Sequence, residues 1–230
     1  MEKIPIVACS VGSPTVEMLI ASHRLYASEH KLIVHYDKPT TFGENYNNLL
    51  DEVFRKYDEV IVANDDIVLN PTCTKILIED VNYLKKNFGI ENKLGFVGAM
   101  HDMARPVQNI RYKFSDDDVL QFEKWKTETL IKQVPVVAPI FAYLSREAFS
   151  VAKFPLTNWY SDDIICEDLT KAGFYHFIST SYVHHVGSAT LGPKERNLEH
   201  SAKAMMWIKE NRPEHLEEMN KRFKMGSIEK

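Results

Sequence analysis

Short β-branched runs alternate with amphipathic helical patterns through the first part of the chain, and this alternation restricts the fold more than any other feature. Buried strands are indicated by apolar runs at 4–11, 31–37, 58–63 and 94–100. Between these runs, apolar residues recur at helical spacing, as in 44–57. An order of β-α-β-α-β-α-β implies an α/β fold with a mostly parallel, Rossmann-like sheet and helices on both faces.

The pattern changes after residue 100, where a polar and irregular stretch extends to about residue 133. Regular periodicity then returns, and no repeat or linker interrupts it, so we expect one domain over 1–230. The elements expected in this second part are a strand at 134–145, a helix at 162–172, a strand at 175–185 and C-terminal helices over 197–225 that break near Pro213.

Composition excludes several classes of protein. The chain has 230 residues and a formal net charge of -4, which predicts no general attraction to nucleic acid or anionic membrane. Its three cysteines are far apart in the sequence, which argues against a disulfide framework and for a reducing compartment. The longest apolar stretch is far shorter than the ~20 residues that span a bilayer. We therefore expect a soluble, cytoplasmic protein.

The strand expected at 58–63 stops abruptly at Asn64-Asp65-Asp66. Polar residues at this position lie at the carboxyl edge of a sheet, where open α/β folds bind ligands. Carboxylates there are suited to hold a divalent cation and, through it, a phosphate group. The alternative is that Asn64 and Asp66 only begin a turn, because Asn and Asp favour turns.

Two further places carry residue types that are suited to chemistry. Asp162 and Asp163 lie at the start of an expected helix, where the helix dipole favours an ionised carboxylate; alternatively Ser161 or Asp162 only caps that helix. His184 and His185 end the last expected strand, and neutral imidazole is a common ligand for transition metals. Adjacent strand residues point to opposite faces, so at most one of these histidines is expected to face a site. A buried histidine that is only satisfied by a hydrogen bond is the alternative.

Other signatures are missing or weak. Gly12 stands alone after the first strand, so neither a Walker loop nor a dinucleotide fingerprint can be drawn. No GxSxG nucleophile elbow occurs. The acidic run at 116–118 follows no apolar strand, and we interpret it as a solvated turn.

Taken in order, these motifs resemble those of the family 2 glycosyltransferases, enzymes of the GT-A fold that use nucleotide sugars. Residues 64–66 resemble the DxD element of that family, 159–174 resemble its ED segment, and 184–188 resemble the histidine that follows the next strand. The resemblance covers the chain from Ile4 to about Trp207.

The chain departs from the family pattern in three places. The DxD element begins with Asn64, which leaves Asp66 as its main carboxylate. The ED segment begins Ser161-Asp162 instead of Glu-Asp. The loop after the first strand reads Ala8-Cys9-Ser10, where Pro-Thr-Tyr is usual.

The resemblance implies a GT-A-like fold in which different parts of the single domain have different functions. Residues 1–100 would form the nucleotide-binding half, 101–196 the acceptor-binding and catalytic half, and 197–230 a C-terminal helical extension. The resemblance also implies a phage or bacterial type of enzyme.

The chemistry implied is an inverting transfer from a UDP-sugar or other nucleotide sugar to a hydroxyl of a glycan, or of a modified DNA base. Asp66 would hold Mn²⁺ or Mg²⁺ together with His184 or His185; an imidazole ligand favours Mn²⁺. Asp162 would be the general base, with Asp163 one register away. The donor-binding residues implied are Ser10, Asp37, Asn64 and Asp65.

Two other functions fit the same motifs. A nucleotidyltransferase would also use strand-end carboxylates and a metal, but it usually carries a Gly-rich basic loop after the first strand, which this chain lacks. A degenerate relative that binds sugar or nucleotide without turnover is the second alternative, and Asn64 keeps it open.

Overall fold

The computed structural model describes the backbone of residues 3–36, 38, 40–90, 93–102, 107–110, 113–114, 120–121, 130–187 and 194–217, and the side chains of these residues except 113–114, 120–121 and 194–197. Three features from the sequence lie outside the described residues. They are Asp37, the acidic run at 116–118, and the tail from residue 218 onward.

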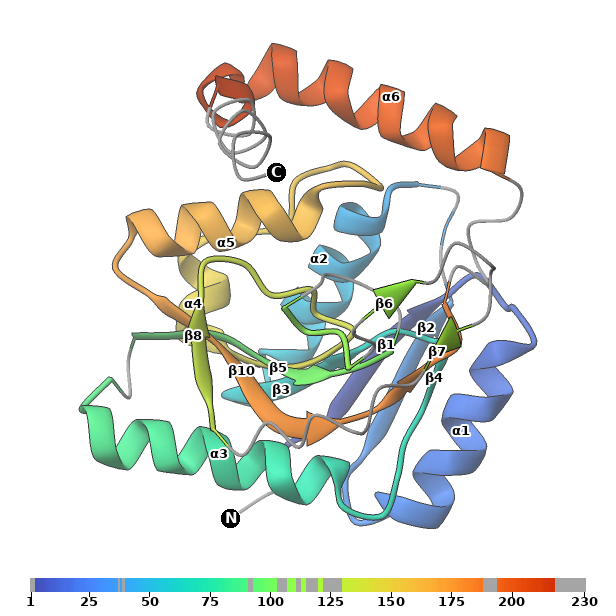
Figure 1. Ribbon diagram of the computed structural model, residues 1–230, viewed down its shortest axis with the longest axis vertical. Coiled ribbons are helices and arrows are strands. Elements are labelled where there is room, and N and C mark those ends of the chain that lie inside the picture. The colour runs from blue at the N-terminus through green and yellow to red at the C-terminus, as the bar shows by residue number, and fades with distance from the viewer. Residues whose placement is uncertain are drawn as a thin grey trace.

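A mixed, mostly parallel sheet of seven strands forms the centre of the described structure (Figure 1). Its order is β2-β1-β3-β9-β5-β10-β8. Strand β1 pairs in parallel with β2 and β3, and β5 pairs in parallel with β10. Strand β9 runs antiparallel between β3 and β5, and β8 is antiparallel to β10. The strands are β1 Ile6–Ser10, β2 Leu32–Tyr36, β3 Glu59–Ala63, β5 Leu94–Met100, β8 Lys132–Val134, β9 Phe141–Ser145 and β10 Tyr175–Tyr182.

Helices cover both faces of this sheet, as the alternating pattern predicts (Figure 1). Helices α1 and α3 lie on one face, and α2, α4 and α5 lie on the other, with α6 outside α5. After α6, a further helical turn begins at Pro213, where the break is expected. No helix in the described part of the chain is long and apolar enough to cross a membrane. The helices are α1 Thr15–Tyr26, α2 Phe42–Val53, α3 Cys73–Phe88, α4 Arg146–Val151, α5 Ser161–Lys171 and α6 Lys194–Asn211.

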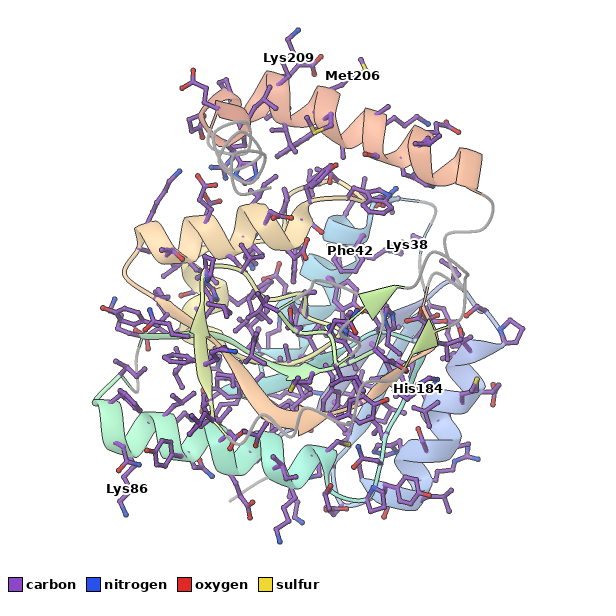
Figure 2. All side chains as sticks on the ribbon, viewed as in Figure 1. Lys38, Phe42, Lys86, His184, Met206 and Lys209 are labelled. Carbon is purple, nitrogen blue, oxygen red and sulfur yellow. The ribbon has the colours of Figure 1, made fainter. Side chains whose placement is uncertain are left out.

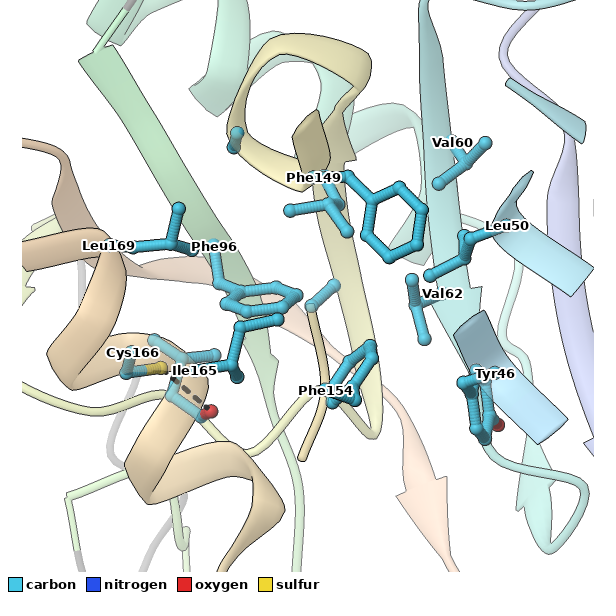
Figure 3. Packing of buried hydrophobic residues seen from close by; sticks show 14 of the residues in the cluster. Tyr46, Leu50, Val60, Val62, Phe96, Phe149, Phe154, Ile165, Cys166 and Leu169 are labelled. Atoms are coloured by element: carbon cyan, nitrogen blue, oxygen red, sulfur yellow. Dashed lines mark hydrogen bonds between the residues drawn. The ribbon is translucent and has the colours of Figure 1, made fainter. Parts of the chain in front are cut away.

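Two hydrophobic cores result, one on each face of the sheet. Strand β3 contributes to both, because Val60 and Val62 pack into the core under α2, α4 and α5 while Ile61 packs into the opposite core. This is the behaviour expected of a continuous apolar run. Figure 3 shows the first core, where Phe96 of β5 and Phe154 lie with ring centroids 6.1 Å apart.

The structure corrects two expected strands. Most of the first half of the strand expected at 134–145 is not a strand: only Val134 belongs to β8, and β9 begins at Phe141. Residues 135–140, including Pro139, carry the chain from one side of β10 to the position between β3 and β5. The strand expected at 175–185 ends as β10 at Tyr182. It is followed by β11 His184–His185, which pairs antiparallel with β4 Ile67–Val68 in a separate two-stranded ribbon.

Candidate functional site

The polar tip of β3 lies at the carboxyl edge of the sheet, where the sequence places a ligand site. Strand β3 ends at Ala63, and the backbone N–H of Asn64 donates to the carbonyl of Ile140 over 2.9 Å. Asp65 and Asp66 follow in the turn before β4, and both side chains are buried. Buried carboxylates require partners, and those partners define the site.

Asp66 meets His185, a residue 119 positions later in the chain. The ring Nε2 of His185 lies 3.1 Å from Oδ1 of Asp66, and both side chains are buried. The β4–β11 ribbon brings them together, because Ile67 pairs with His185 and the N–H of Val186 donates to the carbonyl of Asp66. The structure thus places two of the three residues predicted to bind metal in direct contact.

His184 meets a second carboxylate, Asp102, just beyond the carboxyl end of β5. Nδ1 of His184 lies 2.6 Å from Oδ2 of Asp102, and the backbone N–H of His185 donates to Oδ1 of the same carboxylate over 2.8 Å. Figure 2 shows His184 at the end of the sheet where β4 lies. The two histidines therefore face two different acids, and the expectation that at most one of them faces a ligand stays a prediction.

Sequence reasoning missed Asp102 and its neighbour His101 as site residues. Both follow an expected strand directly, which was the signal that singled out Asp66. His101 is 0% exposed, and neither ring nitrogen has a hydrogen-bond partner among the described residues. Its ring packs edge-on against that of His185, with centroids 5.8 Å apart. Burial, followed by the charge of His185, lowers the pKa of His101 to about 3, so this imidazole is neutral.

Asp65 points away from this cluster, toward the loop after β1. Ser10 donates its hydroxyl proton to Asp65 over 2.6 Å, and Ser13 lies 3.3 Å from the same oxygen. Burial raises the pKa of the Asp65 carboxyl; the Ser10 bond opposes the shift and the charge of Asp66 adds to it. The Ser10 oxygen also accepts from the N–H of Gly12, whose φ of 78° is left-handed. Ser10 and Asp65 thus shape this loop, and their role at a nucleotide stays a prediction.

Asp162 and Asp163 lie in the first turn of α5, which begins at Ser161. The N-cap residue is Tyr160, and its side chain makes no cap hydrogen bond, so neither Ser161 nor Asp162 occupies the N-cap position. Tyr160 has a φ of 61°, the only positive φ of a non-glycine residue in the described part of the chain. Strained backbone of this kind concentrates at functional sites.

The loop before α5 is tied to the carboxyl side of the sheet. Helix α2 follows the carboxyl end of β2, and its first N–H, on Phe42, donates to Oδ1 of Asn158 over 2.7 Å. The N–H of Gly43 donates to the carbonyl of Thr157 in the same loop. The start of α5 therefore lies at the end of the sheet that also carries the tips of β3 and β5.

No family model matches the sequence, and a search of curated proteins finds none that is similar. Among solved structures, the chain is similar to that titled "Crystal Structure of A197 from STIV", with a TM-score of 0.51 and 13% sequence identity. The match covers 81% of this chain and 87% of that chain. At this identity the likeness concerns the fold alone: a mixed α/β sheet flanked by helices.

Proposed function

We propose that this protein is an inverting, metal-dependent glycosyltransferase that moves a sugar from a nucleotide sugar to a hydroxyl group. The observation that carries the proposal is the contact between Asp66 and His185 at the carboxyl edge of the sheet. The ordered resemblance to the DxD, ED and histidine elements supports it. So does the α/β fold, because such sheets bind ligands at this edge.

The side chains at this edge fit a divalent cation that arrives with phosphate. Among the described residues, no group of three or more His, Cys, Asp or Glu side chains is placed to hold a metal alone. Ions such as Mg²⁺ bound with substrate phosphates commonly use one or two protein carboxylates, the phosphates and water. Asp66 and one imidazole would therefore be the protein ligands, and the imidazole favours Mn²⁺.

Transfer would be a single displacement. The acceptor oxygen attacks the anomeric carbon, its proton passes to the Asp162 carboxylate, and the bond from that carbon to the diphosphate oxygen breaks, with the electron pair leaving on the diphosphate. When bound, the divalent ion supplies charge stabilisation to that leaving group.

The donor site would be lined by Asn64, Asp65, Ser10 and Asp37. The acceptor is a glycan hydroxyl or that of a modified DNA base, and the expected location is the cytoplasm.

Thermal unfolding with a panel of nucleoside diphosphates, each with and without Mn²⁺, tests the donor site. We expect stabilisation that needs nucleotide and metal together, about 2.7 kcal/mol at 100 times Kd. The stabilisation should disappear in Asp66→Ala and persist in Glu79→Ala, a matched change of an exposed acid on α3. A wild-type protein that responds to no nucleotide would refute the proposal, and a response independent of metal would favour a binding module.

Replacing the candidate base tests the transfer step. Asp162→Asn removes the proton acceptor but keeps the shape of the side chain. It should therefore preserve nucleotide-dependent stabilisation and lower the transfer rate by about 10²–10⁴. The matched control is Asp163→Asn, in the same turn of α5. Should Asp163→Asn lose transfer while Asp162→Asn keeps it, the base is Asp163.

A further inference from the structure

Asp102 holds both histidines of β11 through its two carboxylate oxygens. Oδ2 lies 2.6 Å from Nδ1 of His184, and Oδ1 accepts the backbone N–H of His185 over 2.8 Å. The Asp102 residue is 2% exposed. The backbone N–H of His185 fixes this buried carboxylate, which in turn determines how the His184 ring is turned.

This contact determines which ring nitrogen of His184 is presented outward. A carboxylate only accepts hydrogen bonds, so Nδ1 carries the proton that it shares with Asp102. In the neutral ring, Nε2 then has the lone pair, and the side chain is 48% exposed. Metal-ligating histidines commonly donate their other ring N–H to a carboxylate in this way.

His185 has the opposite arrangement. Its Nε2 faces Oδ1 of Asp66 at 3.1 Å, and its side chain is only 9% exposed. A nitrogen that donates to a carboxylate has no lone pair for a cation. His185 therefore holds Asp66 in place through this nitrogen, in the manner of an outer-shell partner.

We infer that Asp102 is a positioning residue that presents Nε2 of His184 to the cation, so that His184 and Asp66 are the protein ligands and His185 orients Asp66. This inference rests on the proposed function. The ribbon supports it, since the N–H of Val186, two residues from His184, donates to the carbonyl of Asp66. Asp66 and His184 thus belong to one short, paired segment.

Mn²⁺ affinity of the full chain, measured by calorimetry or electron paramagnetic resonance in saturating UDP, tests the assignment without turnover. Asp102→Asn and His184→Gln should each weaken Mn²⁺ binding by roughly 10- to 100-fold. His185→Gln should weaken it less, because an amide N–H still donates to Asp66. The matched control is Asp80→Asn, since Asp80 likewise accepts a backbone N–H, that of Thr180 at 2.8 Å. It should leave Mn²⁺ affinity unchanged.

Nitrogen-15 spectra of the histidine rings, recorded without metal, give a second readout. His184 should have its proton on Nδ1 in the wild type, and a mixture of tautomers in Asp102→Asn. If Asp102 had only a structural role, its replacement would not change the ratio of the two His184 tautomers. If Asp102→Asn does not fold, His184→Gln carries the test, because the half-exposed His184 side chain tolerates replacement.

The outcomes separate the inference from the proposed function. One result would overturn the inference alone: Asp66→Ala abolishes Mn²⁺ binding, but Asp102→Asn and His184→Gln each keep an Mn²⁺ affinity within about threefold of wild type. Changes of this kind around a metal ligand usually cost more. A His184 proton on Nε2 in the wild type also overturns it. Wild-type protein that binds no Mn²⁺ with UDP or with any other nucleoside diphosphate of the panel, or Asp66→Ala that binds it normally, refutes the proposed function and the inference together.

Discussion

Two fully buried histidines differ in their partners. Nδ1 of His176 accepts the backbone N–H of Phe96, and Nε2–H donates to the carbonyl of Cys166, each over 3.0 Å. His176 thus ties β10 to β5 and α5. Neither nitrogen of His101 has a partner among the described residues. A buried polar group without a partner costs about 1–3 kcal/mol, whereas a paired one stabilises the fold.

The same substitution should therefore have opposite effects at the two positions. His176→Leu leaves the Phe96 N–H and the Cys166 carbonyl unpaired, and should lower the free energy of unfolding by roughly 2–4 kcal/mol. His101→Leu removes two unpaired nitrogens, and should leave that free energy unchanged or raise it by about 1 kcal/mol. Urea unfolding of both variants measures the difference. Equal destabilisation would mean that His101 has a polar partner in solution.

Residue identity at strand ends also explains which site residues were predictable. Asp66, His184 and His185 stand out because a polar residue directly follows an apolar run. Asp102 and His101 follow a strand in the same way, but their stretch continues as polar sequence, so nothing separates them from a surface loop. Which carboxylate meets which imidazole depends on the register of β4 with β11, and two-residue strands carry no periodic pattern.

At the scale of elements, α6 is held against α5 by an apolar contact and by charge pairs. Ile208 is fully buried and packs with Ile164 of α5. Arg212 forms two bonds with the Asp168 carboxylate, at 3.0 and 2.7 Å, and His215 bonds to Glu167. The Arg212–Asp168 pair is partly exposed and contributes little. The His215–Glu167 pair is largely buried, so its attraction is offset by the cost of desolvating both groups. We therefore expect the apolar contact to dominate.

Shortening the buried side chain should loosen this helix locally. Ile208→Ala should destabilise the docked α6 by about 2–4 kcal/mol, because it removes apolar contacts and leaves a cavity. Amide hydrogen exchange in α6 should then accelerate, while exchange in β5 and β10 stays as in the wild type. Met206→Ala, on the same helix with 63% of the residue exposed, is the control and should change little. Equal exchange in the two variants would show that the charge pairs hold α6.

Periodic elements were predictable from the sequence and aperiodic ones were not. The helices α2 and α5 have apolar residues at helical spacing, and their positions agree with expectation to within a few residues. The split between β8 and β9 was missed, because an apolar run shows burial but not a change of direction. The short helix α4 was also missed, since six residues are too few for a periodic signal.

At the scale of the whole molecule, stability should fall with acid because two buried histidines are neutral in the folded protein. Burial lowers the pKa of His176 to about 4 and that of His101 to about 3. Unfolding returns both to about 6.5, so the unfolded chain binds more protons below that pH. The stabilisation is complete above about pH 6.5 and is lost as the pH falls toward the folded-state values.

The loss attributable to His176 is about 3 kcal/mol between pH 6.5 and pH 4. Urea unfolding measured at intervals from pH 7 to pH 4 should show a shallower decline in His176→Leu than in wild type, because one of the titrating groups is gone. Parallel curves for the two proteins would show that His176 binds the same number of protons in the folded and in the unfolded protein.

The antiparallel strand β9 has a consequence for synthesis on the ribosome. Strands β3 and β5 never touch directly; β9 lies between them, and it is translated after both. A nascent chain that has released only its first hundred residues therefore exposes one edge of β3 and both edges of β5, because β9 and β10 follow later. Unpaired strand edges of this kind readily recruit other chains. Rapid emergence of residues 141–145 from the exit tunnel, or a chaperone that shields these edges until then, would protect the growing polypeptide from aggregation.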